Sequence, residues 1–158
     1  GKTNHAEVIK IEFDEKIISY EEILEKFSKL YGITNTEAGY CGGNIDQTTY
    51  EEVCGGKTNH AEVVKIEFDE KIISYEEIVK FFFEMHNPTT INKQGPNVGT
   101  QYRSEIFFYD DMQKKIAEEI KSNLNNKYNG KIITNISKQN NYCKAEEYHQ
   151  KYIQKKVF

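Results

Sequence analysis

The chain has 158 residues, of which 37% are hydrophobic and 13% aromatic, and this is enough apolar surface to build one folded domain. The composition excludes an intrinsically disordered chain, and the formal net charge of -4 argues against nucleic acid as a partner. We expect neither a signal peptide nor a membrane segment, and therefore a cytoplasmic location. Free thiols are expected at the three cysteines, whose spacing does not match a zinc site: Cys41, Cys54 and Cys143.

Two stretches of the chain, residues 1–23 and 56–78, are almost identical, and only Ile9 and Val64 differ between them. Structural repeats within a fold drift apart, because each copy packs against different neighbours. Copies this similar indicate a recent duplication or a rearranged sequence, and the sequence leaves both origins open.

Each copy predicts a strand, a turn and the beginning of a helix. In the first copy, Ser19 and Glu22 have the spacing of a capping box, in which the side chain of each residue accepts the backbone N–H of the other. We expect a helix to begin at Ser19, to run through Leu30 and to end at Gly32, which suits a left-handed cap.

The second copy follows a polar region. Residues 34–59 hold Gly42, Gly43, Gly55 and Gly56 among polar residues, so we expect them to form loops. Residues 61–68 alternate between two sets of side chains, which predicts a strand with one strongly apolar face. That face carries Glu62, Val64, Ile66 and Phe68. Ser74 and Glu77 repeat the capping box, and the helix they begin should stop before Pro88.

The last third of the chain mixes both kinds of element. Residues 87–103 predict a long loop of the kind that often carries function, and 104–109 and 132–136 predict strands. A helix is expected between these strands, with one apolar face made by Met112, Ile116, Ile120 and Leu124. Residues 145–155 predict a closing helix. We expect a single α+β domain over 1–158, a two-layer sandwich with a ferredoxin-like mixed sheet covered by helices.

Several ordered motifs resemble one family. They are GYCGG at 39–43, TYEEVCGGKTNHAEVV at 49–64, FDEKIISYEEI at 68–78, HNPTTINKQGPNVGTQYRSEIFFY at 86–109 and AEEYHQKY at 145–152. From about residue 27 onward, the chain is similar to the A-type peptide methionine sulfoxide reductases.

The resemblance implies an oxidoreductase of protein repair that needs no cofactor. In this family a cysteine thiolate attacks the sulfur of methionine sulfoxide in a peptide or protein, and thioredoxin later restores the thiol. The family's proton donor falls on Glu62, and its two helper tyrosines fall on Tyr50 and Tyr102. A substrate-binding aspartate of the family falls on Asn97, which keeps hydrogen bonding but carries no charge.

The position of Glu62 supports the role of proton donor independently. A carboxyl group at the edge of an apolar strand face is poorly solvated, which raises its pKa toward the value that proton delivery near neutral pH requires. The alternative is that Glu62 is only the solvated first residue of a strand. The corresponding alternative for Tyr50 and Tyr102 is that each fills the edge of a core.

The chain departs from the family where the nucleophile should be. The family motif Gly-Cys-Phe-Trp aligns with Ile18, Ser19, Tyr20 and Glu21, inside the first copy of the repeat. A serine cannot replace the cysteine, because reduction needs a thiolate that bonds to sulfur and is later released by a thiol. We expect a chain with little or no reductase activity. Two other classes remain: a pseudoenzyme that binds methionine sulfoxide without reducing it, and a structural remnant of a rearranged gene.

Two further possibilities concern individual side chains. Cys41 lies in a glycine-rich loop close in sequence to Tyr50, so it is a possible rescue thiol, unless it is an ordinary free thiol. The pairs His60-x-Glu62 and Glu147-x-His149 have the spacing of metal ligands but lack the additional ligands of a zinc site. We therefore expect no metal centre.

Overall fold

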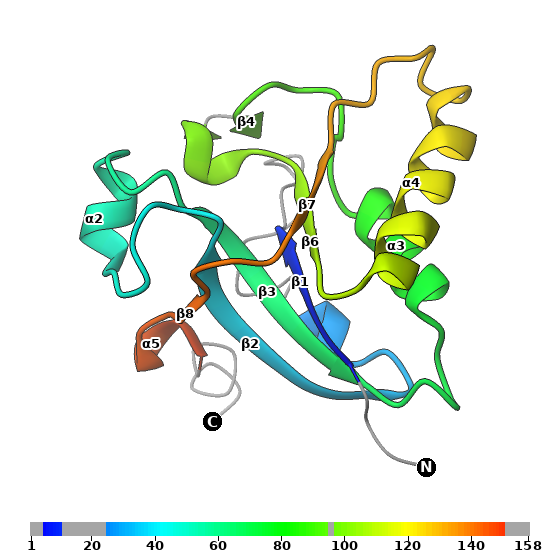
Figure 1. Cartoon of the computed structure of the whole chain (residues 1–158), viewed down its shortest axis with the longest axis horizontal. Helices are drawn as coiled ribbons and strands as arrows, with labels where there is room; N and C mark the ends of the chain where they lie inside the picture. Colours follow the sequence, from blue (N-terminus) through cyan, green and yellow to red (C-terminus); the bar gives the residue numbers. More distant parts are fainter. Residues whose placement is uncertain (1–4, 11–24, 95–96, 151–158) are drawn as a thin grey trace.

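The computed structural model describes residues 5–10, 25–94 and 97–150 of the chain (Figure 1). Its strands are β1 (His5–Lys10), β2 (Ile33–Cys41), β3 (Ala61–Phe68), β4 (Lys93–Gln94), β5 (Asn97–Val98), β6 (Glu105–Phe108), β7 (Asn135–Lys138) and β8 (Cys143–Lys144). Its helices are α2 (Tyr50–Cys54), α3 (Tyr75–Glu84), α4 (Asp111–Asn125), α5 (Glu147–Gln150) and the 3-10 helix η1 (Thr100–Tyr102).

The framework is a six-stranded mixed sheet in the order β7-β6-β1-β3-β2-β8. Neighbouring strands are antiparallel except for β6 and β7, which are parallel. Helices α3 and α4 lie together against the sheet, and α2 and η1 lie near one end of β3 (Figure 1). The expected α+β fold, a mixed sheet covered by helices, is confirmed.

The strands of the two repeat copies are neighbours in this sheet. β1 pairs with β3 in antiparallel register, with Ile9 opposite Val64, Val8 opposite Lys65 and Lys10 opposite Val63. The other edge of β1 pairs with β6. The first copy therefore supplies a central strand, and the second copy supplies the strand beside it.

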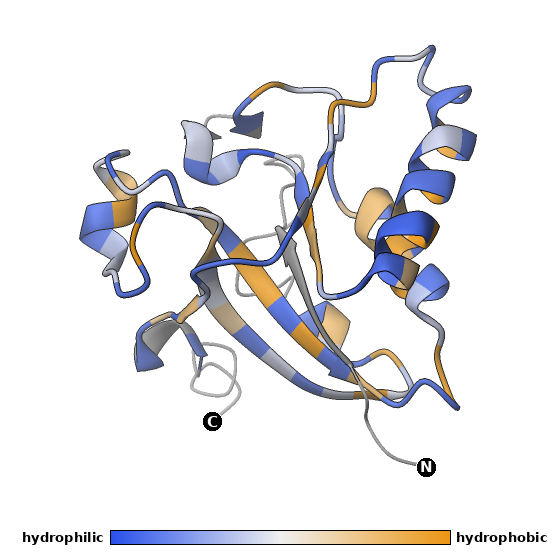
Figure 2. Cartoon of the chain, in the orientation of Figure 1, coloured by the Kyte–Doolittle hydropathy of each residue, from blue (hydrophilic) through white to orange (hydrophobic). Residues whose placement is uncertain are grey.

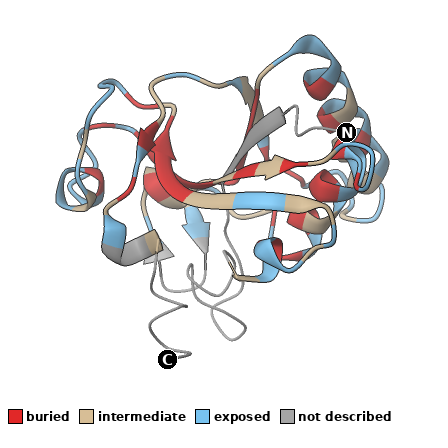
Figure 3. Ribbon diagram, turned by 90° about the horizontal axis from the view of Figure 1, so that it is seen from below, coloured by how far each residue is buried: buried red, intermediate tan, exposed pale blue. Residues whose placement is uncertain are grey.

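The main core lies between the sheet and the helices. Val64 and Ile66 of β3 and Phe82 of α3 are fully buried, and Phe27 joins them from the helical residues 25–28. Figure 2 shows the alternation of apolar and polar residues along β3, and Figure 3 shows buried residues gathered on the sheet and on the helix sides that face it. The predicted apolar face of β3 is thus confirmed.

Helix α3 begins as predicted. The Ser74 side chain accepts the Glu77 backbone N–H at 3.1 Å, and the Glu77 carboxylate accepts the Ser74 N–H, which completes the capping box. The same box in the first copy, at Ser19 and Glu22, lies outside the described residues. Gly32 has a φ of +102°, a conformation that suits glycine and fits its predicted place after a helix.

The prediction of loops over 34–59 was wrong. Strand β2 occupies Ile33–Cys41, and its polar first half is tolerated because only its last four residues are buried. Helix α2 begins with a capping box of its own, in which Thr49 and Glu52 bond to each other's backbone N–H groups. Of the glycines in this region, Gly39 lies within β2, and the other four follow the ends of β2 and α2.

Three details of the later elements differ from the expectation. On α4, the expected apolar face is confirmed for Ile116, Ile120 and Leu124, which belong to the core or pack against it, but Met112 is 67% exposed. Gln113 and Ala117 complete the buried side of the helix. The strand expected over 132–136 begins three residues later, as β7. The described part of the closing helix is the four residues of α5. Within the described part of the chain, no helix has both the length and the apolar sequence needed to cross a membrane.

Candidate active site

Glu62 is the second residue of β3 and is 9% exposed. It lies opposite Tyr40 in the β2–β3 ladder, so both side chains belong to the same face of the sheet. The Tyr40 hydroxyl donates to Glu146 Oε1 at 2.8 Å, and the Tyr50 backbone N–H donates to Glu146 Oε2 at 2.9 Å. One carboxylate of the AEEYHQKY segment therefore joins β2 to the first turn of α2.

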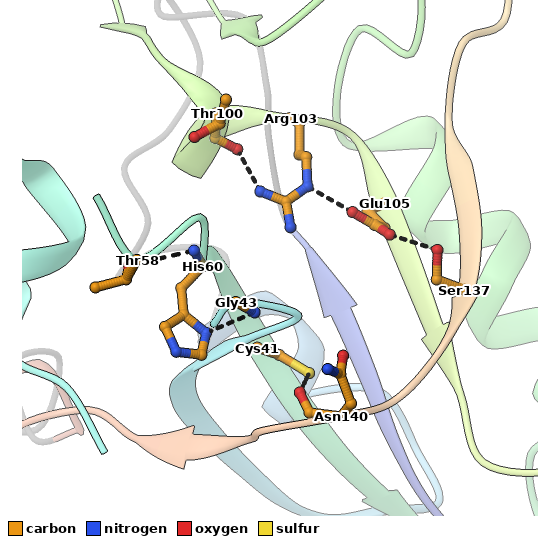
Figure 4. Close-up of polar contacts among 9 residues, drawn as sticks. All are labelled: Cys41, Gly43, Thr58, His60, Thr100, Arg103, Glu105, Ser137 and Asn140. Atoms are coloured by element: carbon orange, nitrogen blue, oxygen red, sulfur yellow. Dashed lines mark hydrogen bonds and ion pairs between the residues drawn. The ribbon is translucent and has the colours of Figure 1, made fainter. Parts of the chain in front are cut away.

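A buried histidine fixes the loop that leads into α2. The His60 Nδ1 atom accepts the Gly43 N–H at 3.0 Å (Figure 4). The His60 Nε2 atom lies 2.6 Å from the Ile45 carbonyl oxygen. Because Nδ1 accepts, the ring proton is on Nε2, which donates to the carbonyl. His60 is therefore structural: it ties the start of β3 to the segment that carries Tyr50.

Tyr50 is the first residue of α2, and its side chain is half-buried. The pKa of the Tyr50 hydroxyl is raised, chiefly by a hydrogen bond with Cys54 and secondly by burial. The charge of Glu62 acts in the same direction. Cys54 lies one helical turn after Tyr50, at the spacing that brings two helix side chains together.

Tyr102 ends η1, and an ion-pair chain holds that turn in place. Arg103 Nη1 donates to the Thr100 carbonyl at 2.8 Å, and Arg103 Nε lies 2.6 Å from Glu105 Oε1 (Figure 4). The Ser137 hydroxyl donates to the other Glu105 oxygen at 2.6 Å. Burial raises the pKa of Tyr102, and the charges of Glu62 and Cys54 raise it further.

The structure thus brings Glu62, Tyr50 and Tyr102 together from β3, α2 and η1. The charge of Glu62 raises the pKa of each tyrosine, in agreement with a carboxyl group near both phenols. Both phenols are protonated at neutral pH, so both are hydrogen-bond donors. Two phenol donors beside a carboxyl group form a site suited to an oxygen atom that gains negative charge.

Cys41 does not join this cluster. Its side chain is fully buried with Ala61, Val63 and Phe107, and its thiol donates to the Asn140 carbonyl at 3.3 Å (Figure 4). Burial raises the pKa of the Cys41 thiol to about 11. A thiol this reluctant to ionise is a poor nucleophile, which argues against Cys41 as the rescue thiol.

The sequence reasoning missed Cys54, which does lie at the cluster. The signal was present in the sequence, because Thr49 and Glu52 have capping-box spacing and predict a helix on which Tyr50 and Cys54 share a face. Assigning the region to loops concealed that relationship.

The remaining sequence candidates are placed only in part. Asn97 pairs with Gln94 in the β4–β5 hairpin, within the predicted functional loop. Ser19 and its neighbours at 18–21 lie outside the described residues. Among the side chains that the structure describes, no three of His, Cys, Asp or Glu are grouped so as to hold a metal ion.

Known proteins resemble this chain along most of its length. The profile of the family described as "Peptide methionine sulfoxide reductase" matches residues 1–31 and 25–157. A peptide methionine sulfoxide reductase MsrA of Pelagibacter ubique is 60% identical over 131 residues, which are 83% of this chain and 89% of the relative.

Solved structures agree with the sequence matches. Reduced Mxr1 from Saccharomyces cerevisiae superposes with a TM-score of 0.85 at 33% identity, over 97% of this chain and 86% of Mxr1. Methionine sulfoxide reductase A of Corynebacterium diphtheriae superposes with a TM-score of 0.82 at 30% identity, over 96% and 74% of the two chains. The chain belongs to the peptide methionine sulfoxide reductase family.

Proposed function

We propose that Glu62, Tyr50 and Tyr102 hold the sulfoxide oxygen of methionine sulfoxide in a peptide or protein. The observation that carries this proposal is the meeting of three elements: Glu146 joins the first turn of α2 to Tyr40, which lies opposite Glu62 on β3, and η1 contacts β3. The pKa of each tyrosine, raised by the charge of Glu62, agrees with that arrangement. The two phenols donate hydrogen bonds to the oxygen, and Glu62, at 9% exposure, supplies the proton that the oxygen takes up. Asn97 contributes a hydrogen bond to the substrate from the loop that also carries Tyr102.

We further propose that efficient turnover is lost. Ser19 occupies the aligned position of the family's nucleophilic cysteine, and a hydroxyl neither bonds to sulfoxide sulfur nor returns through a thiol-disulfide cycle. The chain then acts chiefly as a binder of methionine sulfoxide, which the retained oxygen-binding side chains favour over a structural remnant. Mxr1 of Saccharomyces cerevisiae has been solved in complex with Trx2, so a cytoplasmic thioredoxin is the partner we propose for any thiol cycle.

The test compares the unmodified chain with one in which the family motif is restored. The restored variant carries Ile18→Gly, Ser19→Cys, Tyr20→Phe and Glu21→Trp. With dithiothreitol and a methionine (S)-sulfoxide peptide, the unmodified chain should release little methionine peptide, and the restored variant should release more. Adding Glu62→Gln to the restored variant should lower its rate again, on the order of 100-fold.

Two results would contradict the proposal. Turnover by the unmodified chain equal to that of the restored variant would show that the missing cysteine is not limiting. Failure of the unmodified chain to bind the sulfoxide peptide more tightly than the matching methionine peptide would remove the binding role.

A further inference from the structure

The Glu146 carboxylate binds two parts of the fold at once. One of its oxygens accepts the Tyr40 hydroxyl at 2.8 Å, and the other accepts the Tyr50 backbone N–H at 2.9 Å. The Tyr50 N–H lies in the first turn of α2, where a backbone N–H has no acceptor within the helix. A carboxylate suits this place because it offers two acceptor oxygens, whereas a glutamine amide offers one oxygen and an NH₂ group that donates.

Both donors are tied to the proposed oxygen-binding cluster of Glu62, Tyr50 and Tyr102. Tyr40 lies directly opposite Glu62 in the β2–β3 ladder, where paired residues are about 4.5 to 5.5 Å apart. Tyr50 carries one of the two phenols of the cluster. Glu146 therefore connects the strand beside Glu62 to the helix of Tyr50, and this connection sets how far the Tyr50 phenol is from the Glu62 carboxyl group.

The segment that carries Glu146 is itself fixed to β2. The Ala145 N–H donates to the Ala38 carbonyl at 2.9 Å, and β8 pairs with β2. The Gln150 side chain exchanges two hydrogen bonds with the Ala38 backbone: its oxygen accepts the N–H and its nitrogen donates to the carbonyl, each at 2.7 Å. Glu146 thus lies between two elements, β8 and α5, that are held at the edge of the sheet (Figure 1).

We propose that Glu146 is a positioning residue, whose carboxylate places Tyr50 beside Glu62 so that both side chains can reach the sulfoxide oxygen. This inference rests on the proposed function of the oxygen-binding cluster. Glu146 acts through Tyr50 and not on the substrate, because a donor of the protein engages each of its two oxygens. Tyr102 is held separately, through the ion pair of Arg103.

The inference predicts a defect that is specific to the sulfoxide oxygen. A displaced Tyr50 phenol no longer donates to that oxygen, so loss of the Glu146 carboxylate should weaken binding of a sulfoxide peptide. Binding of the matching methionine peptide, which lacks the oxygen, should not change. A residue that only stabilised the fold would affect the two peptides alike.

The first experiment measures the affinity of the full chain for a methionine (S)-sulfoxide peptide and for the methionine peptide, by isothermal titration calorimetry. Glu146→Gln should reduce the preference for the sulfoxide peptide on the order of 10-fold. Tyr40→Phe removes one of the two donors and should reduce the preference similarly, and the double variant should show no further loss. The matched control is Glu147→Gln, at the exposed neighbouring glutamate, which should keep the full preference.

Tyr40→Phe also keeps the test decisive if Glu146→Gln does not fold, because it leaves the carboxylate and the Tyr50 N–H in place.

The second experiment needs no substrate. The chain is labelled with fluorotyrosine, and the fluorine NMR resonances of Tyr50 and Tyr102 are assigned by their loss in Tyr50→Phe and Tyr102→Phe. Glu62→Gln should shift both resonances, because the carboxyl group lies near both rings. In the Glu146→Gln background, Glu62→Gln should lose its effect on the Tyr50 resonance and keep its effect on the Tyr102 resonance.

The outcomes separate this inference from the proposed function. If the unmodified chain prefers the sulfoxide peptide but Glu146→Gln changes neither that preference nor the Tyr50 response, Glu146 is only structural and the proposed function stands. A lost preference with an unchanged Tyr50 response would also overturn the inference, because Glu146 would then act by another route.

Two results bear on the proposed function itself. If the unmodified chain shows no preference but the Tyr50 response depends on Glu146, the positioning role stands and the oxygen-binding function is wrong. A Tyr50 resonance that does not respond to Glu62→Gln in the unmodified chain would overturn both.

Discussion

Cys41 and Glu62 lie on opposite faces of the central sheet, although Cys41 pairs with Ala61, the residue directly before Glu62. Successive side chains of a strand point to opposite faces, so one step along β3 separates the apolar cluster around Cys41 from the cluster of Glu62 and the tyrosines. Closeness in sequence to Tyr50 made Cys41 a candidate, and the pleat of the sheet places it elsewhere.

The first prediction concerns the pH dependence of stability. Burial raises the pKa of Cys41 from 9.0 to about 11, so the folded state holds this proton more tightly than the unfolded state. The stabilisation is fully present below about pH 9 and is lost as the pH rises through 11. Between about pH 8 and 10.5, the unmodified chain should lose about 2 kcal/mol more unfolding free energy than the Cys41→Ala variant loses over the same pH range. Urea unfolding at each pH measures the free energy of both proteins, and equal losses in the two would contradict the prediction.

The second prediction tests the capping boxes of the repeat. Ser74→Ala removes the acceptor of the Glu77 N–H and should lower the free energy of unfolding by about 1 kcal/mol. Ser122→Ala, at an exposed position inside α4, is the matched control and should cost nothing measurable. Ser19→Ala should cost as much as Ser74→Ala if the first copy caps a helix. An unchanged melting curve for Ser19→Ala would show that the copied signal is not used.

The third prediction concerns the ion pair that holds η1. Arg103 and Glu105 are only 13% and 7% exposed, so Arg103→Met should cost about 3 kcal/mol by leaving the carboxylate without its charged partner. The double variant with Glu105→Gln should cost less than the sum of the single variants, as a denaturant double-mutant cycle would reveal. The exposed pair Lys80–Glu76 is the control, where the coupling should be about 0.5 kcal/mol.

The fourth prediction concerns the ionisation of the site tyrosines. Glu62 is one of the charges that raise the pKa of Tyr50 and Tyr102, so Glu62→Gln should allow both phenols to ionise at lower pH. The measurement is the ultraviolet absorbance of tyrosinate as a function of pH, with and without Glu62→Gln. Repeating it in chains that carry Tyr50→Phe or Tyr102→Phe shows which tyrosine is responsible for the change. Glu67→Gln, at an odd position of the same strand and so on its other face, should leave the titration unaltered. An identical response to both glutamine substitutions would refute the proximity of Glu62.

The parts of the fold that the sequence predicted were those with a strong local signal. The alternation of β3 and the Ser74 capping box each identify an element without knowledge of its neighbours. Strand β2 has no such signal, because its first half is polar and its place is set by pairing with β3. Pairing between distant strands is a tertiary property that a single strand's sequence does not encode.

The candidate site also contains residues that the sequence identified and one that it did not. Glu62, Tyr50 and Tyr102 were identified through the resemblance to a family, and their joint role stays a proposal. Cys54 has no motif of its own. Its place one turn after Tyr50 follows from the capping-box spacing of Thr49 and Glu52, which the assignment of 34–59 to loops concealed.

The pairing of β1 with β3 is self-complementary. Ile9 opposite Val64, the position where the two copies differ, is flanked by Val8 opposite Lys65 and by Lys10 opposite Val63, and the second of these pairs is the first in reverse. Such a ladder has local twofold symmetry, the symmetry of an interface between identical molecules. The β1–β3 contact within one chain is thus of a kind that two chains could form with each other by exchanging β1. In a shortened chain that begins after residue 23, we expect the edge of β3 that now pairs with β1 to be open, and two such edges to pair with each other in this register.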